Sequence, residues 1–175
     1  MIRMGSARSL LLNAALLCAC SPALEWRQMT PAELGVEALF PCRPASIARE
    51  IPLLHSHSRM VMHACSAAGS TYAVSGTTLQ DVGDVAAALE FLRNAAERNL
   101  DAGSAGTQPF TVPGMTPNAL AGRLVLRGRR PDGSSVVEHL VLFTHGVRVY
   151  QASVVGSAPD ASAAATFFGG LKVLP

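Results

Sequence analysis

Side chains that bind metals are concentrated in one short segment of this chain, residues 55–65. The segment holds three histidines, two methionines and a cysteine, namely His55, His57, Met60, Met62, His63 and Cys65. Imidazole and thioether groups suit copper, and a free Cys65 thiolate would too. A strand from Arg59 alternates its faces, so His63 and Cys65 lie on one face and both methionines on the other. We therefore expect the methionines in the core and His55 and His57 in a turn, with a copper site of His55, His57 and His63 as the alternative.

Nucleophilic catalysis needs a serine or cysteine that a neighbouring base activates. The chain has no Gly-x-Ser-x-Gly, Ser-x-x-Lys or His-Glu-x-x-His spacing. Ser75, or Ser134 and Ser135 with His139, supply the residue types without such a spacing. The glycine-rich residues 103–106 lack the lysine that follows in a phosphate-binding loop. We therefore expect a noncatalytic protein without a cofactor.

A different chemistry is indicated near the amino terminus, where Leu17-Cys18-Ala19-Cys20 closes a short apolar run. Arg3 and Arg8 precede the apolar residues 10–17, as in an export signal. That run is too short for a transmembrane helix, which needs about 20 apolar residues. The pattern resembles the lipobox of bacterial lipoprotein signal peptides.

This resemblance implies that residues 1–19 are a signal peptide cut before Cys20, and that Cys20 receives the lipid. Several acyl chains would hold the protein on a membrane, facing the periplasm. Ser21 follows in place of an aspartate, which implies sorting to the outer membrane. An ordinary cleaved signal peptide, with a freely secreted product, is the alternative.

Charge and cysteine content agree with export. The chain has 14 basic and 12 acidic side chains, and removing Arg3 and Arg8 with the signal leaves 12 of each. A neutral domain has no electrostatic footprint for nucleic acid, so we expect no nucleic-acid partner. Once Cys18 and Cys20 are assigned to the signal and the lipid, Cys42 and Cys65 remain, and a pair in an oxidising compartment predicts a disulfide. Two buried free thiols are the alternative.

Hydrophobic periodicity predicts the elements that position these residues. Apolar residues at spacings of three and four predict an amphipathic helix over residues 82–100. Short stretches bounded by turn residues predict two groups of strands, over residues 47–54, 59–67, 71–79, 119–127, 134–143 and 147–155. Residues 101–118 are rich in glycine, proline, serine and threonine, so we expect a loop there. A closing helix is expected from Ser157, with Phe167, Phe168 and Leu171 facing the sheet.

The resulting order, βββ-α-βββ-α, predicts the α+β class, an antiparallel sheet of about six strands covered by two helices. We expect a single domain over residues 38–175, preceded by a lipidated tether and lead-in over residues 20–37. Several motifs resemble a group of uncharacterised proteobacterial lipoproteins whose layout is similar to the PsbP-like α/β/α sandwich. They are the lipobox, Phe40-Pro41-Cys42, residues 60–65, Gly146 to Gln151, Val155-Gly156 and Phe167-Phe168.

The resemblance brings no catalytic residues. The sequence therefore predicts a noncatalytic, lipid-anchored protein of the cell envelope, which binds a protein or another envelope component. A periplasmic lipoprotein that binds a small ligand or copper is the alternative.

Overall fold

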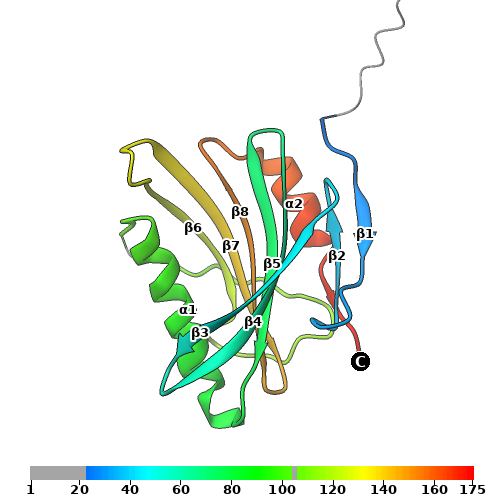
Figure 1. Cartoon of the computed structure of the whole chain (residues 1–175), viewed down its shortest axis with the longest axis vertical. Coiled ribbons are helices and arrows are strands. Elements are labelled where there is room, and N and C mark those ends of the chain that lie inside the picture. The colour runs from blue at the N-terminus through cyan, green and yellow to red at the C-terminus, as the bar shows by residue number, and fades with distance from the viewer. Residues whose placement is uncertain (1–22, 104–105) are drawn as a thin grey trace, which may run out of the picture.

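A six-stranded antiparallel sheet forms the centre of the structure, a computed structural model that describes residues 23–103 and 106–175 (Figure 1). Its strands lie in the spatial order β3 (Ala45–Leu53), β4 (Ser56–Ala67), β5 (Ser70–Thr78), β8 (Arg148–Gly156), β7 (Ser135–His145) and β6 (Gly122–Arg129). Every neighbouring pair is antiparallel. The prediction of an α+β fold with a six-stranded antiparallel sheet is confirmed.

The two helices cover opposite faces of this sheet. Helix α1 (Val85–Asn99) follows a short 3-10 turn, η1 (Val82–Asp84), and packs in a core with Val149 of β8. Helix α2 (Ala161–Gly169) packs in a separate core with Tyr150, the next residue of the same strand. Neighbouring residues of a strand point to opposite faces, so the sheet lies between two cores. No helix in the described part of the chain is long and apolar enough to cross a membrane.

A second, three-stranded sheet was not predicted. It consists of β1 (Arg27–Met29), β2 (Val36–Phe40) and β9 (Lys172–Val173), with β2 in the middle. Val36 and Phe40 are fully buried in the core that contains α2. Much of the segment expected to be a lead-in is therefore part of the fold, and the observed order gains two strands at the start and one at the end.

Strand β4 differs from the prediction in two respects. It begins at Ser56, so His57 lies in the strand, opposite Pro52 of β3, and the turn is confined to Leu54 and His55. Its most buried residue is Val61, which packs in the α2 core.

The prediction that Met60 and Met62 are core side chains is therefore wrong in part. Met60 is half-buried against the α1 core, and Met62 is half-buried outside both cores. The reason is that α1 packs mainly on β7 and β8 and does not extend over this part of β4.

Candidate functional site

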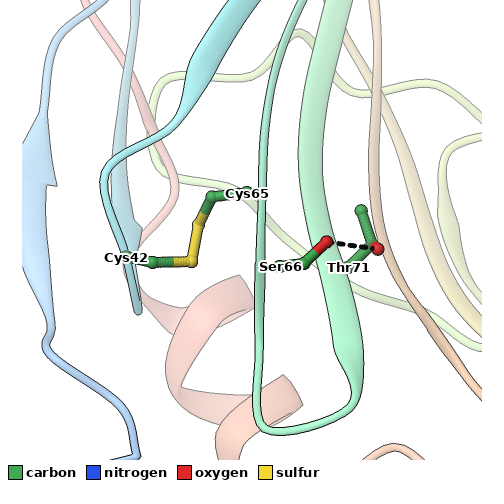
Figure 2. The surroundings of a disulfide bond; sticks show 4 residues. All are labelled: Cys42, Cys65, Ser66 and Thr71. Atoms are coloured by element: carbon green, nitrogen blue, oxygen red, sulfur yellow. Dashed lines mark hydrogen bonds between the residues drawn. A yellow bond between two sulfur atoms is a disulfide. The ribbon is translucent and has the colours of Figure 1, made fainter.

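The disulfide between Cys42 and Cys65 is present, as predicted, with the two Cα atoms 6.0 Å apart. Cys42 follows β2 of the small sheet and Cys65 lies in β4 of the large one, so the bond joins the two sheets (Figure 2). Beside it, the hydroxyl groups of Ser66 and Thr71 form a hydrogen bond of 2.9 Å between β4 and β5. Cys65 is not available as a thiolate ligand in this state.

We expect peptide mapping without reduction to recover the Cys42 peptide joined to the Cys65 peptide, because their Cα separation lies within the range of ordinary disulfides. The same digest after reduction should release both peptides separately. Two free thiols in freshly isolated protein would contradict the pairing.

The structure does not bring the three candidate copper ligands together. His55 and His57 are exposed near the β3–β4 turn, whereas His63 lies six residues further along β4. Six residues of a strand span roughly 20 Å. The His63 Nε2 atom instead lies 3.8 Å from the Glu33 carboxylate and 3.4 Å from the Ser46 hydroxyl. Among the described residues, no group of three or more histidine, cysteine or acidic side chains is placed to hold a metal ion.

Ser75 and His139, a candidate nucleophile and a candidate base, each bond to another group. Ser75 is buried and its hydroxyl donates to the carbonyl of Gln151 at 3.4 Å. The Nδ1 atom of His139 lies 3.0 Å from Nη2 of Arg123. Burial lowers the pKa of His139, and the positive charges of Arg123 and Arg127 lower it further. These contacts place His139 beside arginines.

A hollow of about 240 Å³ lies between the α2 face of the large sheet and the turn of residues 31–35 that connects β1 to β2. Its lining residues are Glu33, Leu34, Arg59, Val61, Gly76, Thr77, Thr78, Arg148 and Tyr150. We call it the arginine hollow, because two guanidinium groups border it. No sequence pattern indicates it, since its residues come from four separate segments.

Strand pairing places these two arginines in one row. Thr78 of β5 lies opposite Arg148 of β8. Val61 of β4 pairs with Gly76 of β5, so Arg59, two residues before Val61, neighbours Thr78 on the same face. Neighbouring strands are about 4.8 Å apart, which puts both arginines within side-chain reach of Thr78.

The contacts of Arg148 hold it against the 31–35 turn. Gly35 has a φ of 62°, which favours glycine, and a Cβ atom there would lie 2.6 Å from Nη1 of Arg148, so a larger residue would require the guanidinium to shift. The Tyr150 hydroxyl donates to the Leu34 carbonyl at 2.9 Å. Burial raises the pKa of Tyr150, while a hydrogen bond and the charge of Arg148 partly offset that rise.

Two acidic residues lie near the arginine hollow, and neither forms an ion pair with its arginines in the described part of the chain. Glu33 borders it, and its carboxylate lies nearest to His63. Glu50 of β3 lies opposite Arg59 in the strand register. Within the described ranges neither Arg59 nor Arg148 forms an ion pair. The arrangement can therefore bind an anion.

One further ionisable group stands apart from the arginine hollow. Glu138 of β7 is 6% exposed and lies opposite Leu126 of β6 and Val155 of β8. Burial raises its pKa from 4.5 to about 7. No part of the described chain gives this carboxyl a hydrogen bond or an ion pair, so it is a buried acid in an apolar layer.

Cys20, the predicted lipidation site, lies outside the described residues. The described part contains the arginine hollow and a disulfide between the two sheets. Comparisons of the chain with protein-family models, with curated proteins and with solved structures found no match.

Proposed function

We propose that this chain is a noncatalytic domain that a lipid on Cys20 anchors to a membrane of the cell envelope, most simply the outer membrane, and that faces the periplasm. The observation that carries the proposal is the sequence Leu17-Cys18-Ala19-Cys20 at the end of the apolar run. The Cys42–Cys65 disulfide supports it, because such bonds persist in oxidising compartments.

Its role in this proposal is to bind an envelope component, with no reaction catalysed. The hydrogen bond of the Ser75 hydroxyl to a backbone carbonyl, and the pairing of His139 with Arg123, support binding over catalysis. A relation to the proteobacterial lipoproteins of PsbP-like layout is part of the proposal.

A protein partner is the first candidate for the bound component. A small ligand is the second, and the arginine hollow favours it. Copper is not favoured, because His63 lies far along β4 from His55 and His57.

We expect Cys20→Ser to move the protein from the membrane pellet to the soluble periplasmic fraction and to abolish labelling with a radioactive fatty acid. The reason is that the lipobox cysteine thiol is the acceptor of the lipid and several acyl chains make attachment effectively permanent. Thermal unfolding should be unchanged, because both cores are built from residues after Cys20.

Cys18→Ser is the matched control, since it removes a thiol two residues away and should leave both labelling and sedimentation unchanged. A Cys20→Ser protein that still carries the fatty acid would contradict the anchor. Equal loss of label in both variants would show that Cys20 is not the specific acceptor.

A further inference from the structure

We propose that the arginine hollow is a binding site for a small oxyanion, a phosphate monoester above all, held by Arg59, Arg148 and the hydroxyl of Thr78. The inference deepens the binding role proposed above by naming the class of ligand. It does not depend on the lipid anchor, because every residue involved lies in the folded domain.

The two guanidinium groups give the site its selectivity for oxyanions. A guanidinium presents a planar fork of N–H donors that matches the oxygens of a phosphate or carboxylate, and its charge persists at any physiological pH. Arg59 and Arg148 flank Thr78 on one face of the sheet. Two positive charges suit a phosphate monoester, which carries nearly two negative charges at neutral pH.

Both arginines are available to a ligand. In the ranges 23–103 and 106–175 neither has a carboxylate within ion-pair distance. The Arg59 backbone carbonyl accepts a hydrogen bond of 2.9 Å from Thr77, which fixes its strand, while its side chain is exposed. Two positive charges that border one hollow and form no ion pair attract an anion into it.

Arg148 is also held in position before a ligand arrives. Its guanidinium lies against the backbone of Gly35 and contacts the hydroxyl of Tyr150, which is itself bonded to the Leu34 carbonyl. The Tyr150 ring in turn needs Gly76, where a Cβ atom would lie 2.7 Å from the ring. Holding a long side chain in its bound position removes part of the entropy loss on binding.

The size of the arginine hollow limits what can enter. Its volume of about 240 Å³ is smaller than the roughly 300–1,000 Å³ of pockets that enclose drug-sized molecules. It therefore accommodates one anionic group with a small attached portion. A larger molecule, such as a phospholipid, would insert only its head group.

Replacing Glu33 should affect oxyanion binding in the opposite direction from replacing either arginine. Its carboxylate borders the same hollow and is 54% exposed, so it repels an incoming anion. Glu33→Gln should therefore tighten the binding of an oxyanion, whereas loss of either arginine should weaken it.

The test is calorimetric titration of the purified full chain in a non-ionic detergent. Three probes are used: inorganic phosphate, glycerol 1-phosphate, and detergent micelles that contain phosphatidic acid. We expect saturable binding that Arg148→Gln and Arg59→Gln each weaken by about tenfold or more, because each removes charge-assisted hydrogen bonds. Thr78→Val should weaken it by a few-fold, and Glu33→Gln should strengthen it by about twofold or more.

Arg98→Gln is the matched control, because Arg98 is an exposed arginine near the end of α1, on the other face of the sheet. It removes the same charge and should change the dissociation constant by less than about twofold. Binding of both phosphates would identify a free ligand, and binding of the phosphatidic acid micelles alone would identify a lipid head group. Either result supports the site, provided that the arginine variants weaken binding of the same probe.

Absence of binding by all three probes would overturn the proposal, as would equal weakening by Arg98→Gln and Arg148→Gln. If Arg148→Gln does not fold, Arg59→Gln and Thr78→Val decide the question, since both positions are exposed. The Cys20→Ser protein should still bind phosphate but should no longer sediment with the membrane. A failure of the site is thereby distinguished from a failure of the anchor.

Discussion

Replacing Phe167 by alanine is expected to lower the free energy of unfolding by about 4 kcal/mol. Phe167 of α2 is fully buried in the core between α2 and the two sheets. Its ring centroid lies 5.4 Å from those of Phe40 in β2 and Tyr72 in β5. The truncation therefore removes contacts from three elements at once and leaves a cavity that they cannot easily close.

Denaturant unfolding with the disulfide intact measures this effect through a lower midpoint at an unchanged m value. Val82→Ala is the control, because Val82 is 68% exposed and should change stability by less than about 0.5 kcal/mol. A Phe167→Ala protein as stable as Val82→Ala would mean that Phe167 is not buried in the core that α2 forms with the two sheets.

Glu138 is expected to make the domain less stable as the pH rises from about 4.5 to about 7. Its pKa in the folded protein, about 7, lies above the value of 4.5 expected without burial. The folded chain therefore binds the proton more tightly than the unfolded chain, so folding is favoured at low pH and this contribution is lost through the folded pKa. A shift of this size corresponds to about 3 kcal/mol.

Glu138→Gln tests the effect, because the amide keeps the shape of the side chain and cannot ionise. Relative to the unmodified protein, the variant should gain about 3 kcal/mol of unfolding free energy between about pH 4 and about pH 8. The comparison must be made with the unmodified protein because the pKa of His139 is lowered from its ordinary value of 6.5. Below pH 6.5, His139 therefore makes the domain more stable as the pH rises, which is opposite to the effect of Glu138. That contribution cancels in the difference.

Glu90→Gln provides the matched control, since Glu90 is exposed on α1. It should leave the pH dependence of stability unchanged. A flat difference between Glu138→Gln and the unmodified protein would refute the description of Glu138 as an uncompensated buried acid.

Much of the central fold could be predicted from local patterns. The spacing of apolar residues predicted a helix over 82–100, and α1 runs over Val85–Asn99 with Leu89 and Leu92 buried. Val82 is exposed because the chain forms a 3-10 turn there before the helix begins. The six central strands were each predicted within a few residues of their observed bounds.

The second sheet could not be predicted in the same way. β1 and β9 are three and two residues long, too short to show alternation. β2 is stable because it pairs with both, and its partner β9 lies at the other end of the chain. The closing helix also begins later than predicted, because Asp160 caps it by accepting the N–H of Ala163 at 2.7 Å.

Several features of this protein follow from local sequence patterns: the lipobox-like pattern ending at Cys20, the remaining cysteine pair, the long amphipathic helix and the alternation along the strands. These features depend on residue type and on spacings of a few residues, which local geometry governs. Long-range packing, in contrast, sets which strand faces meet a core and which charged residues become neighbours. Arg59 and Arg148 meet because β5 lies between their strands, and that pairing follows from the packing of segments distant in the sequence.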